Sequence, residues 1–182
     1  DRAGNALGIG ELSLGHFAIV PATIEWTNRS GGDWNNPANW DEGRLPGADD
    51  DVIVDALPGA VLSLSSGSAT VRNLLTNIQV QFSGGSITVS GEWTVEATVT
   101  ATGGTISHTR VVGSGAITVP GGRTLSLESV TLGADLTVAD SGRLLVSDGS
   151  LVLDGAAIHL QSAGSATLLD FAGAAPLLRG TG

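Results

Sequence analysis

Residues 117–160 read ITVPGGRTLSLESVTLGADLTVADSGRLLVSDGSLVLDGAAIHL, and this stretch decides the fold. Short apolar runs with alternating side chains recur about every seven residues, with turn dipeptides such as Asp148-Gly149 between several of them. A period of two is typical of a β-strand with one row of side chains inward and one outward, whereas a helix needs apolar residues three and four apart. The runs are 117–119, 125–127, 130–132, 136–138, 144–146, 151–153 and 158–160.

The short spacing of these runs favours a parallel β-helix over an antiparallel sandwich or barrel. Antiparallel sandwiches and barrels have longer strands, with turn signals every ~8–12 residues. Three short faces of a coil make one turn of roughly 20–22 residues, and stacked turns cover one another's apolar rows. The sequence therefore predicts a right-handed parallel β-helix of about six turns over residues 52–172, roughly 28 Å long at ~4.8 Å per turn.

Alternation also appears before residue 117. Residues 78–82 alternate, and residues 93–101 alternate without interruption from Trp93 to Ala101. We expect residues 93–101 to form one continuous strand, with Trp93 in the inward row. No segment beyond residue 25 has a helical pattern.

The composition divides the chain into three parts. Residues 1–24 are a lead-in, which would serve as a linker, as a strand, or as a segment that pairs with a neighbouring subunit. Residues 25–51 contain three tryptophans and several acids, and we expect them to cap the open edges at the N-terminal end of the coil. Residues 52–182 are predicted to be the β-solenoid.

The chain of 182 residues has eight Lys plus Arg, eighteen acids and no cysteine or methionine. A net charge of −10 argues against nucleic acid as a partner, and the lack of cysteine excludes disulfides and thiolate sites. No run approaches eighteen apolar residues, so no membrane insertion is expected. The first residue is Asp1, which predicts a processed chain or a piece of a longer one.

One stretch resembles a known class of proteins. Trp26-Thr-Asn-Arg-Ser-Gly-Gly-Asp-Trp34, Asn39-Trp40, Pro46-Gly47 and Asp51-Val-Ile-Val54 are similar to the opening of β-helical segments in large bacterial surface and secreted proteins, including adhesins and autotransporter-like passengers. The resemblance covers residues 25–172. It implies an extracellular or cell-surface location and an adhesive, structural or carrier role, and it brings no catalytic residues.

Two clusters in the segment 25–51 are candidate binding sites. Exposed tryptophan faces stack on sugar rings, so Trp26, Trp34 and Trp40 are candidate glycan-binding residues; the alternative is a buried plug over the end of the coil. Clustered carboxylates bind Ca²⁺ through oxygen ligands, so Asp49, Asp50 and Asp51 are candidate metal ligands. The alternative is that Asp50 or Asp51 stabilises a local turn or strand end, and that the protein needs no cofactor.

The rest of the sequence carries little chemistry. Threonine rows such as Thr98-Val-Thr100 resemble those of ice-binding solenoids but are too irregular, so ordinary outward residues are expected. The acids in the repeats mostly lie beside glycine in turns, and the three histidines lie in separate turns. The chain is therefore not expected to be an enzyme. We expect a stiff shaft or filament subunit that contacts its own copies or other surface proteins; the alternative is a carbohydrate-binding or polysaccharide-processing β-helix.

Overall fold

The computed structural model describes residues 21–173 and 175–181, and in this part of the chain nearly all regular structure is β-strand. The strands form three parallel sheets, and one short 3₁₀ helix, η1 (Pro37–Asn39), lies near the N-terminal end. Sheet 1 contains β1 (Thr23–Glu25), β3 (Asp51–Val54), β6 (Asn73–Thr76), β9 (Glu92–Val95), β12 (Arg110–Val112), β15 (Val130–Leu132), β18 (Ser150–Asp154) and β21 (Leu177–Thr181). Sheet 2 contains β2 (Gly32–Asp33), β4 (Val61–Leu64), β7 (Gln79–Phe82), β10 (Val99–Ala101), β13 (Ile117–Val119), β16 (Leu136–Val138) and β19 (Ile158–Leu160). Sheet 3 contains β5 (Ser68–Val71), β8 (Ser86–Val89), β11 (Thr105–Ser107), β14 (Thr124–Glu128), β17 (Arg143–Val146) and β20 (Leu168–Phe171).

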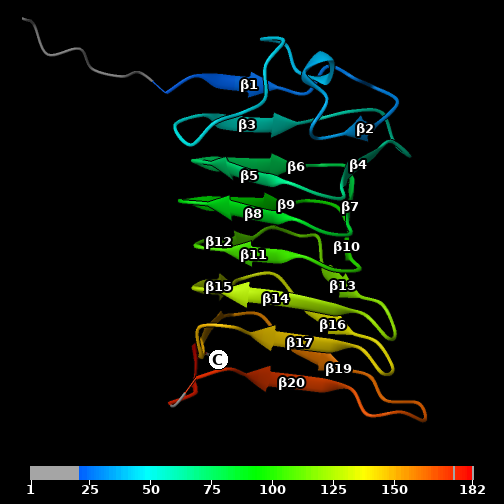
Figure 1. The fold of residues 1–182 in the computed structure, drawn as a ribbon, viewed down its shortest axis with the longest axis vertical. Coiled ribbons are helices and arrows are strands. Elements are labelled where there is room, and N and C mark those ends of the chain that lie inside the picture. Colours follow the sequence, from blue (N-terminus) through cyan, green and yellow to red (C-terminus); the bar gives the residue numbers. More distant parts are fainter. Residues whose placement is uncertain (1–20, 174, 182) are drawn as a thin grey trace, which may run out of the picture.

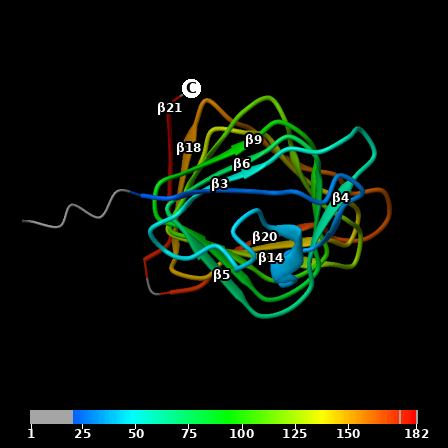
Figure 2. The same cartoon turned by 90° about the horizontal axis from the view of Figure 1, so that it is seen from above.

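Successive strands belong to successive sheets, so the chain winds as a coil. Each set from β3-β4-β5 to β18-β19-β20 is one turn, which gives six complete turns (Figure 1). Seen from the N-terminal end, the path from β3 through β4 to β5 runs clockwise while the chain moves away from the viewer (Figure 2). The coil is therefore right-handed, and the predicted parallel β-helix of about six turns is confirmed.

The register places like residues above one another. Along sheet 2, Leu62, Val80, Val99, Ile117 and Leu136 pair in one column, 18 or 19 residues apart. These five side chains are at most 4% exposed, so each turn covers the inward row of the next. All seven runs predicted between residues 117 and 160 lie within strands of the coil.

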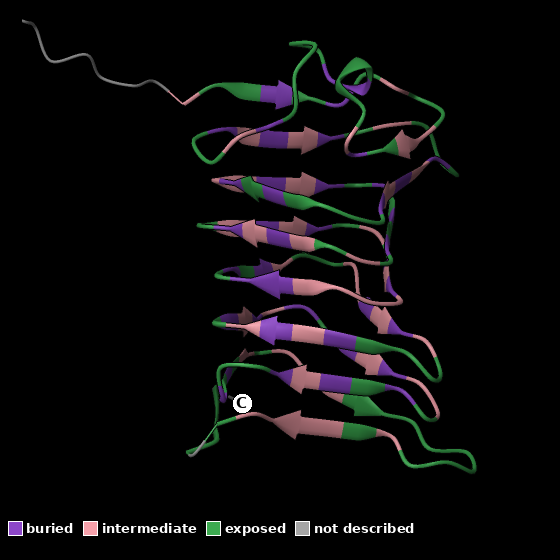
Figure 3. Cartoon of the chain, in the orientation of Figure 1, coloured by how far each residue is buried: buried purple, intermediate pink, exposed green. Residues whose placement is uncertain are grey.

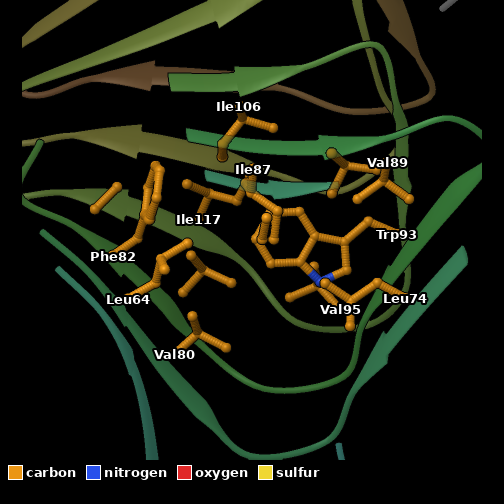
Figure 4. Close-up of a cluster of buried hydrophobic side chains, with 14 of the residues drawn as sticks. Leu64, Leu74, Val80, Phe82, Ile87, Val89, Trp93, Val95, Ile106 and Ile117 are labelled. Carbon is orange, nitrogen blue, oxygen red and sulfur yellow. The ribbon is translucent and has the colours of Figure 1, made fainter. Parts of the chain in front are cut away.

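The interior is a single apolar cluster that runs through all six turns. Side chains from two sheets point into it: Trp93 and Leu74 from sheet 1, and Phe82 and Leu64 from sheet 2 (Figure 4). The one polar atom of Trp93, its indole Nε1, donates a hydrogen bond to Thr76 Oγ1 at 3.1 Å. That bond satisfies two buried polar groups at once, which allows a large indole to fill the centre of the coil.

The predicted single strand over residues 93–101 is wrong. The alternation continues, but β9 ends at Val95 and β10 begins at Val99, with a corner between them. Ala97 lies in that corner and is partly exposed. The next turn carries Gly115 at the equivalent corner, where a Cβ would lie 2.3 Å from the carbonyl oxygen of Ala97, so small residues are required there.

The strands at the start of the described chain pair across the predicted boundary near residue 51. β1 begins at Thr23 and pairs in parallel with β3, and β2 pairs in parallel with β4. Residues 25–51 are thus hydrogen-bonded into the first turn of the coil, and their role as a cap stays a prediction. The lead-in predicted for residues 1–24 lies mostly outside the described residues.

Candidate functional site

The three tryptophans of segment 25–51 pack on one another. The ring centroids of Trp26 and Trp40 are 4.9 Å apart and those of Trp34 and Trp40 are 4.8 Å apart, both with edge-to-face geometry. The residues are only 5%, 2% and 2% exposed for Trp26, Trp34 and Trp40. Their indole groups are also satisfied internally, because Trp26 Nε1 donates to the Asn28 carbonyl and Trp40 Nε1 to the Trp34 carbonyl. No ring face is free to stack on a sugar, so the packing supports the buried alternative.

A set of asparagines holds the chain around this cluster. Asn28 Nδ2 donates to Asn39 Oδ1 at 2.9 Å, and Asn39 Nδ2 donates to the Asp33 carbonyl at 2.8 Å. Asn36 is the N-cap of η1 and accepts a hydrogen bond from the Ala38 amide. The sequence pattern Asn-Arg-Ser at residues 28–30 fits a glycosylation acceptor, but the amide group of Asn28 already has a structural partner.

In the acidic cluster, Asp50 pairs with Arg44. Asp50 is 6% exposed and accepts two hydrogen bonds from Arg44, at 2.6 and 3.0 Å, and one from the Gly47 amide at 2.7 Å. The hydrogen bonds from Arg44 hold the pKa of Asp50 below its usual value, with help from Gly47 and against the opposing effect of burial. Asp50 therefore closes the loop before β3, as the turn alternative predicted.

The other two candidate calcium ligands are separated from this arrangement. Asp51 contacts Arg72 and accepts a hydrogen bond from Asn73 Nδ2 at 2.8 Å, which joins β3 to β6. Asp49 is exposed in the turn before β3. Among the described residues, no group of three or more His, Asp, Glu or Cys side chains is arranged to hold a metal ion.

The acids of the later turns bond to the neighbouring turn at its corners. Asp135 Oδ1 accepts the Ala157 amide at 2.8 Å, and Asp140 Oδ1 accepts the amides of Ala163 and Ser165 at 2.8 and 3.0 Å. The Ala163 and Ser165 bonds lower the pKa of Asp140. These carboxylates satisfy backbone amides where the chain leaves the sheet ladder, a role that the short-range turn signals did not reveal.

Arg110 contacts acids on two other strands of sheet 1. Its guanidinium contacts Glu92 one turn before at 2.9 Å and Asp154 two turns after at 2.7 Å. The three side chains lie on the outer face of sheet 1, and both contacts raise the pKa of Arg110. A carboxylate pair that brackets a cation is a structural tie across four turns of one sheet, and it offers no unpaired acid or base for catalysis.

Hydroxyl-bearing residues form outward columns that the sequence alone could not align. Ser68, Ser86, Thr105 and Ser126 pair in register along sheet 3. In sheet 2 the column Thr100, Thr118 and Thr137 is flanked by Gln81 and His159. The threonine rows are therefore short: the sheet 2 row spans three strands and ends at Gln81 and His159, and the sheet 3 column is mostly serine.

A hollow of about 470 Å³ lies beside the start of the coil, between β1 and the loop after β3. Its lining includes the acids Glu25 and Asp55 and the basic residue Arg29, and Asp55 accepts a hydrogen bond from Asn77 Nδ2 at 2.6 Å. Such groups can bind hydroxyls or small polar ligands, but the lining includes no histidine, lysine or cysteine. The lining residues are Glu25, Trp26, Thr27, Arg29, Ile53, Asp55, Ala56 and Leu57.

Two further observations bear on function. The part of the chain that the structure describes has no helix long and apolar enough to cross a membrane. No protein-family model, no curated protein and no solved structure matches this chain.

Proposed function

We propose that this chain is a stiff shaft, a structural segment of an exported bacterial surface protein that holds other parts of an assembly at a fixed distance. The observation that carries the proposal is the single apolar core that continues without a break through six in-register turns. A close-packed interior of this kind resists bending because every turn is hydrogen-bonded and packed to the next.

Two further features support the proposal. The polar side chains of the turns are used to tie neighbouring turns together, as with Asp51 to Asn73 and Asp135 to the Ala157 amide. The opening around Trp26, Trp34 and Asp51-Val-Ile-Val54 resembles β-helical segments of bacterial surface proteins, which supports an extracellular location.

A distance measurement between two spin labels tests the stiffness. The chain has no cysteine, so Thr23→Cys and Val152→Cys place labels only where they are wanted. Both residues are exposed, and they lie in one outward column of sheet 1, six strand spacings apart, or about 29 Å. With the labelled protein diluted into unlabelled protein, we expect one narrow distance distribution near that value. A broad distribution, or several distances, would refute the shaft.

A carbohydrate-binding role at the hollow beside β1 is the second candidate. The observation that favours it is the convergence of Glu25, Asp55 and Arg29 on one open cavity, where carboxylate and guanidinium groups would bind sugar hydroxyls. Retention of the protein in polysaccharide-containing gels, lost on Arg29→Ala, would support this role. Arg123→Ala is the matched control, because Arg123 is also exposed but lies away from the hollow. Equal mobility of all three proteins on every polysaccharide would remove it.

A further inference from the structure

The outer face of sheet 1 carries a column of mostly apolar side chains. Along β3, β6, β9 and β12, buried residues alternate with half-buried or exposed ones that face outward (Figure 3). Ile53 pairs with Leu75, Leu75 with Thr94, and Thr94 with Val112, so these four half-buried residues form one column about 14 Å long. Every described strand belongs to one of the three sheets and η1 lies at the N-terminal end, so no further strand or helix of the described chain covers this column.

The charges at the beginning of these strands are balanced by ion pairs. Asp51 pairs with Arg72, and Arg110 pairs with both Glu92 and Asp154. Three acids and two arginines leave a formal charge of −1 on this side of the column, so it attracts an approaching ion only weakly.

The carboxylates beyond the ends of the strands are not balanced in this way. Asp55 follows β3 and accepts a hydrogen bond from Asn77 Nδ2 at 2.6 Å; Glu96 follows β9 and accepts one from Ser114 Oγ at 2.5 Å. Both donors are neutral, and in the described part of the chain no arginine or histidine forms an ion pair with either acid. The two acids lie two strand spacings apart, about 10 Å, along one flank of the column.

The other two faces of the coil lack this combination. No charged residue occurs in β4, β7, β10, β13 and β16 of sheet 2, or in β5, β8 and β11 of sheet 3. Their aligned outward residues are mainly serine, threonine and glutamine. An apolar column with unbalanced negative charge along one flank favours a partner that is both apolar and basic.

This chain contains no segment of that kind. Its eight basic residues are all arginines, and the two that are nearest in sequence, Arg110 and Arg123, are 13 residues apart. A second copy, with a net charge of −10, would be repelled from the face. The charge complementarity therefore points to a different polypeptide.

The spacing of the column favours a helix over an extended strand as the bound segment. Successive side chains of the column are about 4.8 Å apart, whereas side chains on one face of a helix recur every ~5.4 Å and those on one face of a strand every ~6.6 Å. Over three steps a helix that lies along the coil drifts out of step by about 2 Å, and a strand by about 5 Å.

We propose that the outer face of sheet 1 is a docking surface for a basic amphipathic helix of another polypeptide. The helix lies along the axis of the coil, with its apolar side chains on Ile53, Leu75 and Val112. Its lysine or arginine side chains pair with Asp55 and Glu96. The inference goes beyond the shaft and does not depend on it, since a coil that binds no helix would still be stiff.

Synthetic peptides test the chemistry of the partner. The probe is a dye-labelled peptide of about 14 residues, roughly 21 Å long as a helix, with leucines at helical spacing and lysines between them. We expect its fluorescence anisotropy to rise on binding, and the affinity to fall as salt screens the carboxylates. A peptide with glutamate in place of lysine, and one of the same composition with leucine and lysine in strict alternation, should bind at least about ten-fold more weakly. Failure of the probe to bind, or equal binding of either control peptide, would overturn the proposal.

Substitutions test the location of the docking surface. Leu75→Thr and Glu96→Gln should each weaken binding of the probe by about five-fold or more. The matched controls are Leu145→Thr and Glu128→Gln, which change an outward leucine and an outward acid of sheet 3 and should leave binding unchanged. Circular dichroism establishes that each variant is folded. Unchanged affinity in Leu75→Thr or Glu96→Gln, or equal weakening by its control, would overturn the proposal; neither residue lines the hollow beside β1.

Discussion

The packing of the coil predicts opposite outcomes for two adjacent substitutions, Val99→Asp and Thr98→Asp. Val99 begins β10, is 0% exposed, and lies between Val80 of the preceding turn and Ile117 of the next. Thr98 is exposed in the corner before it. Both variants add the same carboxylate to the same region of the sequence, so a difference between them reports only which way each side chain points.

The magnitude for Val99→Asp has two parts. Loss of the buried isopropyl group costs about 1.5–3 kcal/mol. Burial raises the pKa of a carboxyl by about 3 units or more, and holding it protonated at pH 7 then costs about 1.4 kcal/mol per unit, or about 4 kcal/mol. The total of about 6 kcal/mol is comparable with the whole stability of a typical domain, about 5–15 kcal/mol. Thr98→Asp should change the free energy of unfolding by no more than about 0.5 kcal/mol.

Urea unfolding at pH 5 and pH 7 measures both effects. The folded state of Val99→Asp binds its proton more tightly than the unfolded state, so this variant loses stability relative to Thr98→Asp as pH rises above about 4. We expect the gap between the two variants to be smaller at pH 5 than at pH 7. Equal unfolding midpoints for the two variants, or a gap that does not change with pH, would refute the inward assignment of Val99.

Three other predictions concern the first turns and the corners. Asp50→Asn should lower the free energy of unfolding by about 1–2 kcal/mol near pH 6. The pKa of Asp50 is lowered in the folded state, so the difference in stability between the two proteins should shrink as pH falls below about 3.8. Acid titration of both proteins measures this change. Trp34→Ala should cost about 3–5 kcal/mol in urea unfolding, and a loss below about 1 kcal/mol would mean that the ring is not packed. Gly113→Ala should lower the melting temperature far more than Gly59→Ala. Both glycines have a positive φ, but only at Gly113 would a Cβ meet backbone, because it would lie 2.2 Å from the Val95 carbonyl oxygen. Similar melting temperatures for the two variants would contradict this.

The strands and the winding of the coil could be predicted from the sequence because they depend on local alternation. Each short run such as 117–119 or 136–138 carries its own inward and outward residues. A run of three alternating residues bounded by turn signals is too short for a helix and therefore indicates a strand. The corner at residues 96–98 could not be predicted, because Ala97 continues the same alternation; the break between β9 and β10 is set by how this segment packs against the next turn, where Gly115 leaves no room for a side chain. The spacing between paired strands of successive turns also varies, from 18 residues between Val99 and Ile117 to 30 between Gly32 and Leu62.

The sites were harder to predict because their partners lie one or more turns away. Asp50 could be assigned to a local turn, since Gly47 and Arg44 are close in sequence. Asp51 could not, because its partners Arg72 and Asn73 are 21 and 22 residues away. The tryptophans look the same in sequence whether they are buried or exposed, and the choice depends on the first turn of the coil beneath them.

The arrangement of acids explains why a chain with eighteen of them presents so little chemistry. A corner breaks the ladder of backbone hydrogen bonds, and the amides that lose a partner there need an acceptor. Asp135 and Asp140 supply one to the following turn, and Glu96 accepts hydrogen bonds from the amide and hydroxyl of Ser114. A carboxylate held in this way is fixed by the backbone amide that it accepts from, which suits a structural tie between turns. The sides of the coil are therefore committed to holding neighbouring turns together.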